Sequence, residues 1–377
     1  MSVGLVDRYG SSLICDVLTA YRRDLERTPD VLTFGADDAR WLRFGVRVEQ
    51  WAADAQPARW RKGAVPLRPA PRPGQLLRIT EQMEAAGAIT LAYATLAAAR
   101  RVWDTAEPQS AAQAIFRQAR ILRTAGATQA AENCFTYLYG FATRHRLAEL
   151  RGRALVGRGI LRMIGGDRRA ALKWYGRARV ASGHHPVVVG VSYHGEMALA
   201  LGAGDDSGAL IAGYKALATR ALPGWDEAGV LINLAGITLR AGEAHTALQL
   251  VGRAARRSRQ PRMRMGTFAK GALAAAALGR RAIVERFAAR LVATAAAVNL
   301  PYEELEARSE VAEAFARIGD VAKARRWARA IQRDATREDF VSIVARCERL
   351  LESGVPDAEP GVLSAPARRV VAQLQEA

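Results

Sequence analysis

The chain has 377 residues, of which 50% are hydrophobic, 24% charged and 7% aromatic. This composition provides enough apolar side chains for a core and excludes a chain that is disordered throughout. The net charge is +18, but only five of the 55 basic residues are lysines, so the arginine excess is as typical of a GC-rich genome as of an anion-binding protein.

The three cysteines, Cys15, Cys134 and Cys347, are far apart in the sequence. Their spacing predicts neither a disulfide framework nor a CxxC metal site. The N-terminal residues do not resemble a signal peptide, and no stretch of the sequence is apolar for long enough to cross a membrane. We therefore expect a soluble, cytoplasmic protein without membrane contacts.

Residues 1–56 are predicted to form a helical N-terminal extension, because apolar side chains recur at helical spacing from Ser11 to Leu25 and again from Asp37 to Ala55. Residues 57–75 contain five prolines and five basic residues but no acidic residue. This composition is typical of an extended linker or a basic tether.

A turn signal then recurs seven times between Ala-rich helical segments. Successive turn glycines are 39, 40, 38, 38, 37 and 40 residues apart, which indicates an internal repeat. The glycines are Gly87, Gly126, Gly166, Gly204, Gly242, Gly279 and Gly319.

Positions counted from each glycine are also regular. The residue five positions downstream is Ala in six of the seven repeats, the residue twelve positions downstream is always apolar, and the residue seven positions upstream is mostly Ala or Gly. The two downstream positions are two helical turns apart and lie on one helix face, where a small residue allows another helix to approach closely. Each repeat therefore predicts a helix, a Gly-centred turn and a second helix.

These small residues and the turn glycine resemble those of tetratricopeptide repeats. The resemblance implies an all-α, right-handed superhelical solenoid of about seven helical hairpins over residues 76–337. The units here are longer than the usual 34 residues, and the large aromatic expected early in the first helix is mostly missing. Residues 338–377 are predicted to contain a capping helix from Asp339 to Glu352, a linker, and a short helix from Pro366 to Glu376 that either docks or frays.

No nucleophile motif, phosphate-binding loop, dinucleotide fingerprint or metal-ligand spacing occurs in the sequence. We therefore expect a protein that is not an enzyme and needs no cofactor or metal ion. Charge is unevenly distributed: residues 144–180 have a net charge of +9, residues 250–290 have +10, and residues 301–320 are acidic. This polarity favours a charged partner.

Polar residues of the first helices are the candidate binding residues. Gln113, Arg117 and Arg120 form a polar stripe opposite an apolar helix face. The tetratricopeptide resemblance implies that such residues line a concave inner surface, and the same offset from the turn glycine adds Arg78, Arg153, His194, Asn233, Lys270, Glu306, Glu310 and Glu313. Of these, Asn233 matches the Asn with which the family commonly holds a ligand's backbone.

The sequence therefore predicts a non-catalytic scaffold or regulatory adaptor that binds a protein segment, expected to be acidic, through Gln113, Arg117, Arg120, Arg153, Asn233 and Lys270. The alternative is a nucleic-acid-associated protein that uses the Arg-rich repeats and the basic linker on phosphates without sequence preference. A sensor for a small molecule or peptide remains a third possibility. The oligomeric state does not follow from the sequence.

Overall fold

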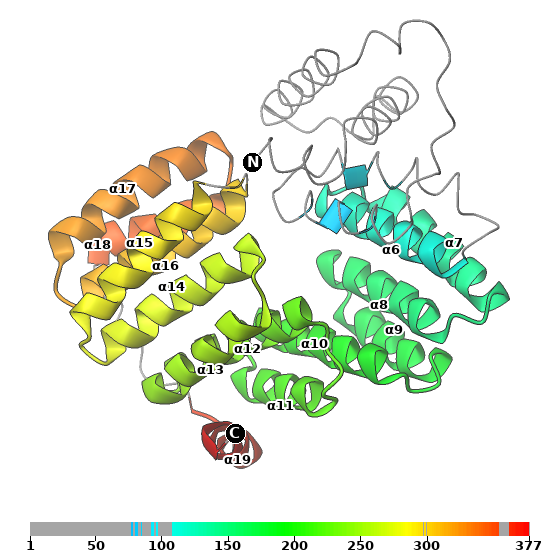
Figure 1. The fold of residues 1–377 in the computed structure, drawn as a ribbon. Helices are drawn as coiled ribbons and strands as arrows, with labels where there is room; N and C mark the ends of the chain where they lie inside the picture. Colours follow the sequence, from blue (N-terminus) through cyan, green and yellow to red (C-terminus); the bar gives the residue numbers. More distant parts are fainter. Residues whose placement is uncertain are drawn as a thin grey trace, which may run out of the picture. The chain divides into compact units, whose positions relative to one another are not determined.

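A computed structural model describes residues 108–296, 298, 300–353 and 362–376, together with a few isolated positions between 77 and 96. The helices expected in residues 1–56, the basic segment 57–75 and Gly87 lie outside the described residues. All regular secondary structure in the described part is helical, from α6 to α19 (Figure 1). The predicted all-α class is confirmed.

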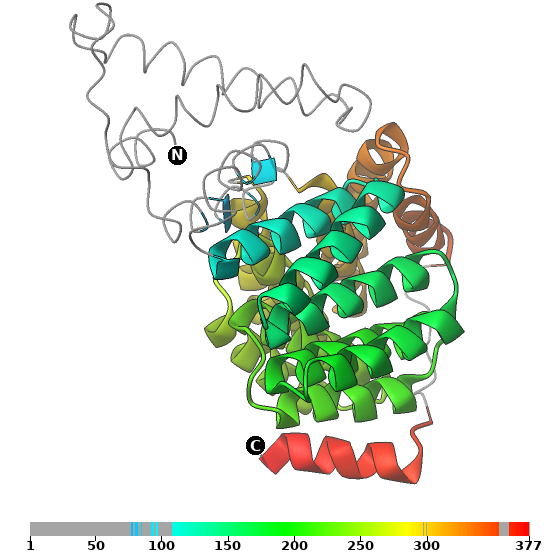
Figure 2. The ribbon, with the colours of Figure 1, turned by 90° about the vertical axis from the view of Figure 1, so that its right-hand side faces the viewer.

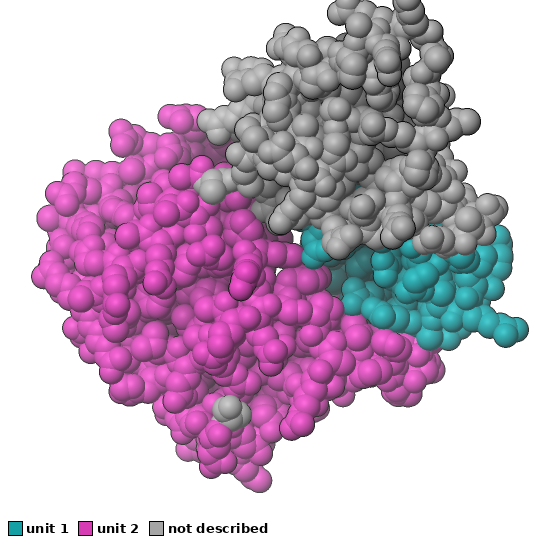
Figure 3. Space-filling view, in the orientation of Figure 1, with its two compact units in different colours: residues 1–165 teal, residues 166–377 magenta. Residues whose placement is uncertain are grey.

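The described residues divide into two compact units, 1–165 and 166–377 (Figure 3). In the first unit, α6 (Pro108–Thr124) and α7 (Thr128–Arg144) form a hairpin, and α8 (Ala148–Ile164) packs on both. Each of these three helices has 17 residues. The prediction of alternating helices and short turns is therefore confirmed in this unit.

The second unit begins with α9 (Arg168–Ala181) and continues with four hairpins (Figure 2). The first helix of each hairpin has 17 residues, whereas the second varies from 13 to 17. The hairpins are α10 (Pro186–Gly202) with α11 (Asp206–Ala218), α12 (Gly224–Arg240) with α13 (Ala244–Arg257), α14 (Pro261–Ala277) with α15 (Arg281–Ala295), and α16 (Pro301–Arg317) with α17 (Val321–Arg337).

The turn glycines adopt the left-handed conformation that the repeat pattern predicts. All six described members have a φ between 67° and 84°, a region that a Cβ atom disfavours. At Gly126 the chain reverses through a hydrogen bond from the backbone N–H of Ala127 to the carbonyl of Leu122 (2.9 Å). In three repeats an Asp then caps the second helix, as Asp167 does by accepting from the N–H of Ala170 (2.9 Å).

The repeated small and apolar positions are core positions. The described residues five positions after the turn glycine are at most 1% exposed: Ala92 at the N-terminal end, followed by Ala131, Ala171, Ala209, Ala247, Val284 and Ala324. The side chains twelve positions downstream are at most 2% exposed in the described repeats: Leu138, Ala178, Ala216, Ala254, Leu291 and Ile331. The predicted interface rows are confirmed.

Some of these helices approach so closely that glycine is required. A Cβ atom on Gly195 of α10 would lie 2.5 Å from Cζ of Tyr175 on α9. Gly157 of α8 accommodates the ring of Phe135 on α7 in the same way, at 2.3 Å. A larger side chain at either site would displace a fully buried aromatic ring.

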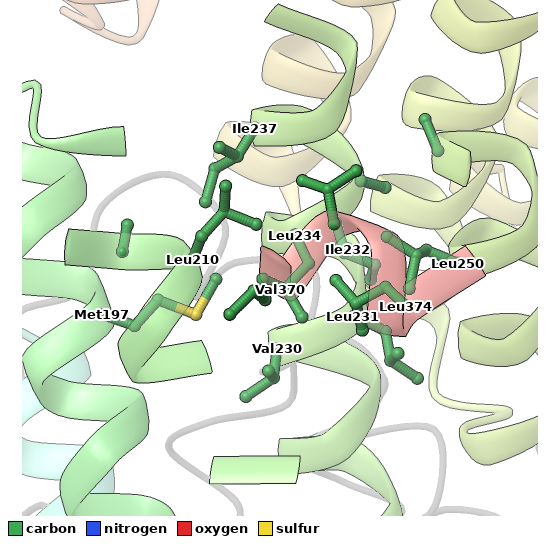
Figure 4. Close-up of a cluster of buried hydrophobic side chains, with 14 of the residues drawn as sticks. Met197, Leu210, Val230, Leu231, Ile232, Leu234, Ile237, Leu250, Val370 and Leu374 are labelled. Carbon is green, nitrogen blue, oxygen red and sulfur yellow. The ribbon is translucent and has the colours of Figure 1, made fainter. Parts of the chain in front are cut away.

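Two helices follow the last hairpin. The predicted capping helix is α18 (Val341–Ser353), which packs on α16 and α17. The final helix is α19 (Ala365–Glu376), and it docks on α11 and α13 rather than on its neighbours in the sequence. In Figure 4, Val370 and Leu374 of α19 lie in one apolar cluster with Leu210 and Leu250.

Candidate interaction surface on the first helices of the hairpins

In the first unit, the predicted polar stripe of α6 is engaged within the chain. The guanidinium of Arg117 donates to the carbonyl of Leu77 (2.7 Å) and to Oε2 of Glu81 (3.2 Å). Its side chain is 21% exposed. Arg117 therefore joins α6 to the segment that precedes it.

Arg120 and Arg153 are engaged in a similar way. Arg120 lies 3.5 Å from Oε2 of Glu84 and stacks over the ring of Phe116. Burial raises the pKa of Glu84, and the positive charges of Arg120 and Arg117 only partly oppose that increase. Arg153 pairs with Glu149 at 2.8 Å and stacks over the same Phe116 ring.

Gln113 is half-buried on α6, and its amide makes no side-chain hydrogen bond among the described residues. It is therefore more available than the three arginines around it. Arg78, which the same offset selects, lies outside the described residues.

In the second unit, the first helices α10, α12, α14 and α16 pack in order. One face of α12 carries Asp226, Gly229, Asn233, Gly236 and Arg240, spaced by three or four residues. This spacing places them in one narrow stripe. We refer to these five residues as the α12 strip; from Asp226 to Arg240 it measures about 21 Å at 1.5 Å per residue.

Asn233 is at the centre of the α12 strip. Its amide is half-buried and forms no side-chain hydrogen bond among the described residues. Gly229 and Gly236, one turn away on either side, are unusual in the middle of a helix because glycine costs about 1 kcal/mol relative to alanine there. Gly229 is half-buried, whereas Gly236 is buried.

Two cationic side chains lie at the end of the strip beyond Gly236. A Cβ atom on Gly236 would lie 3.7 Å from Nζ of Lys270 and 3.9 Å from Nη1 of Arg240. Lys270 donates to Oε1 of Glu310 (2.6 Å), and Arg240 makes two hydrogen bonds to Asp206. Both cations are therefore positioned by a carboxylate.

The other end of the strip is a buried carboxylate. Asp226 is 5% exposed, and its Oδ1 lies 3.8 Å from Nδ1 of His194 on α10. Its Oδ2 has no hydrogen-bond partner among the described residues. The edge of His194 and the sulfur of Met263 border the space beside Gly229.

Asn233, Lys270 and His194 remain sequence-based candidates, and the sequence did not indicate the residues that complete their surroundings. Arg346, on the capping helix, approaches Oε1 of Glu310 (3.6 Å) and donates to Ser309 Oγ (3.2 Å). Burial and the nearby Glu310 raise the pKa of Glu306. The two glycines seven residues apart around Asn233 were a signal that the sequence offered.

Several arginines of the second helices differ from the paired arginines described above. Exposed arginines on α15 and α17 form no ion pair among the described residues: Arg286, Arg290, Arg325, Arg326, Arg329 and Arg333. Glu285 on α15 is already paired with Lys323. The unpaired positive charge of this region therefore lies on the outward faces of the second helices.

No group of three or more His, Cys, Asp or Glu side chains in the described part of the chain could hold a metal ion. Of the helices described, none combines the length and apolarity that a membrane span requires.

No protein-family model matches the chain, and no curated protein matches it. Among solved structures, the chain is similar to the crystal structure of the P58(IPK) TPR domain at 2.5 Å, with 11% sequence identity and a TM-score of 0.23. The alignment covers 81% of this chain and 97% of that one. The helical-hairpin repeat itself is established by the helices, turns and buried rows described above.

Proposed function

We propose that this protein is a non-catalytic cytoplasmic scaffold or adaptor, and that the α12 strip holds a segment of a partner protein. The observation that carries this proposal is the free amide of Asn233 between two mid-helix glycines. Glycine is unfavourable inside a helix. Gly236 is buried beside Lys270, so the half-buried Gly229 and Asn233 are the part of the strip that a partner would approach closely.

An amide side chain suits the backbone of an extended segment. It offers an N–H donor and a carbonyl acceptor, which together match one peptide unit. At about 3.3 Å per residue, the strip of about 21 Å accommodates roughly six extended residues. The preformed helix would bind such a segment without first being ordered.

Charge at the two ends favours one orientation and an acidic residue. A carboxylate of the segment would contact Arg240, the exposed cation at the end of the strip, with Lys270 close by. The unpartnered oxygen of Asp226 is itself buried, so the partly exposed His194 beside it is the polar group that the segment would reach at the opposite end. These two ends support the acidic partner expected from the sequence while restricting the acidic contact to one end.

Two variants test the strip by affinity capture from an extract of the native cells, with nuclease treatment to remove nucleic-acid bridges. Asn233→Ala removes the amide, and Gly229→Leu covers the half-buried backbone beside it; both should reduce capture of the protein partner at least tenfold, with the melting temperature as the check that each variant is folded. The matched controls are Asn133→Ala on α7 and Gly252→Leu on α13, where open space surrounds the glycine except for Arg256. Normal capture by both strip variants would contradict the proposal.

A nucleic-acid-associated function is the second candidate. The observation in its favour is the set of exposed, unpaired arginines on α15 and α17. Guanidinium groups bind phosphates well, and phosphate contacts carry no sequence information directly. We therefore expect this contribution to be independent of sequence.

A further inference from the structure

The C-terminal helix occupies a well-defined seat on the second helices of two hairpins, α11 and α13 (Figure 4). We refer to this surface of α11 and α13 as the helix seat. The segment that docks there buries five apolar side chains, each at most 8% exposed: Leu363, Ala367, Val370, Val371 and Leu374. These side chains belong to the same apolar cluster as core residues of α11 and α13.

Polar contacts at both ends fix the direction and register of the docked helix. At its start, the backbone N–H of Ser364 donates to Oγ of Ser207 on α11 (2.9 Å). At its end, Nε2 of Gln375 donates to Oε2 of Glu243 (3.2 Å) and to Oγ1 of Thr246 (3.0 Å). The helix seat therefore matches this helix at both ends, and an unrelated amphipathic helix would match only its apolar middle.

The sequence of α11 is apolar at a position that the C-terminal helix covers. Seven positions after the turn glycine, α9, α15 and α17 carry the exposed Lys173, Arg286 and Arg326. The same position in α11 is Ile211, which packs against the apolar cluster that contains the C-terminal helix. Its neighbour Leu210 is fully buried. Uncovered, α11 would expose an apolar face.

The seat contains nothing that requires the docked helix to come from its own chain. The contacts of α19 are with α11 and α13, and its covalent connection runs through residues 354–361. We propose that the helix seat is a self-association surface, which accepts the C-terminal helix of a second copy of this chain in the same register, so that two chains exchange α19 reciprocally. Exchange preserves every contact of the closed chain.

The tether determines when exchange occurs. For a connection as short as residues 354–361, the effective concentration of the chain's own helix is in the millimolar range. Dilute protein should therefore be closed and monomeric, and exchanged dimers should accumulate as the protein approaches that concentration. This proposal is independent of the α12 strip, which lies on the first helices.

The exchange is tested by mixing two full-length variants, each of which carries one added cysteine. Ser207→Cys and Ser364→Cys place thiols on opposite sides of the observed contact, whose Cα atoms are within about 7 Å, the range of a disulfide. The two variants are mixed at high and low concentration and treated with a short bis-maleimide. A dimer that contains one chain of each variant should form, rising at least tenfold in yield from micromolar to near-millimolar protein.

Three controls make the result decisive. A chain carrying both substitutions should cross-link within itself at low concentration, which shows that the sites can react. Each variant alone, and the parent with its native cysteines, give the background. Adding Leu374→Asp and Val370→Asp to the Ser364→Cys chain should abolish the mixed dimer. Efficient internal cross-linking without any mixed dimer at high concentration would overturn the proposal, as would a mixed dimer that survives the two aspartates.

Discussion

Lys270 on α14 and Glu310 on α16 form an ion pair, with Nζ and Oε1 2.6 Å apart. Both residues lie nine positions before a turn glycine, Gly279 and Gly319. The pair therefore joins equivalent positions of consecutive repeats. Lys270 also borders the α12 strip. The ion pair that joins these two hairpins therefore also holds a cation of the candidate site in place.

Lys270→Met should destabilise the protein. The side chain of Glu310 is 9% exposed, and loss of its closest cation leaves a buried carboxylate with Arg346 at 3.6 Å as the remaining partner. We expect a loss of about 1–3 kcal/mol in the free energy of unfolding, measured by urea denaturation. Lys173→Met, at an exposed position of α9, is the matched control and should change stability by less than about 0.5 kcal/mol. Equal effects of the two variants would show that the ion pair adds nothing.

Ala247→Trp should destabilise by about 1–3 kcal/mol, because an indole cannot fit between closely packed helices without displacing them. Ala247 is fully buried on α13, and Ala171 on α9 is equivalent and should respond alike. Ala255→Trp, at an exposed position of α13, controls for the effect of tryptophan on helix propensity. The measurement is chemical denaturation of all three variants, and tolerance at both buried sites would mean that the repeated Ala row is not an interface.

The repeat was predictable from sequence because each hairpin imposes the same physical requirements. A left-handed turn needs Gly126 and its equivalents, and close helix contacts need Ala247 and its equivalents, so the requirements appear as a regular spacing. The capping helix was predictable for the same reason, since Ile343 and Leu350 continue the apolar pattern and are buried.

The pairing of the arginines could not be read from sequence. Arg117 lies on the polar face of a helix, as expected, but its partners Leu77 and Glu81 are about one repeat away and depend on how helices stack. Docking of α19 was unpredictable for a similar reason. Its seat is more than 100 residues earlier in the chain, and the local sign was the apolar Ile211 where α9, α15 and α17 carry a cation.

Compared with the parent protein, the Glu84→Gln variant should gain more unfolding free energy at pH 7 than at pH 4. Burial raises the pKa of Glu84 above its ordinary value of 4.5, so the folded protein binds this proton more tightly than the unfolded chain. The stability associated with the protonated carboxyl is present below pH 4.5 and is lost as the pH rises through the folded-state pKa. Glutamine cannot ionise and avoids that loss.

The measurement for Glu84 is the difference in unfolding free energy between variant and parent at several pH values. Glu352→Gln, at an exposed position of α18, controls for the loss of one negative charge. A difference that stays constant from pH 4 to pH 7 would contradict the expectation that burial disfavours the charged carboxylate.

The last prediction distinguishes an adaptor from a nucleic-acid-binding protein. A chain of net charge +18 attracts polyanions, so retardation of DNA at low salt shows only charge. Binding through six to ten phosphates weakens by about three to five orders of magnitude between 50 and 200 mM salt, whereas a specific complex also keeps a sequence preference. We expect weak, steeply salt-dependent binding of both DNA and RNA, without a preferred sequence.

Removing exposed arginines from two different helices tests whether the binding depends on where the arginines lie. A triple variant on α17, Arg326→Gln with Arg329→Gln and Arg333→Gln, should lower the salt dependence by about one counterion for each arginine that contacts a phosphate. An equal triple on α9, Arg168→Gln with Arg169→Gln and Arg177→Gln, should lower it to a similar extent, because non-specific attraction does not depend on which exposed arginine is removed. Filter binding across a salt series measures both. If one triple abolished a nanomolar complex at 150 mM salt and the other left it intact, the arginines would form a dedicated nucleic-acid site and the adaptor proposal would be replaced.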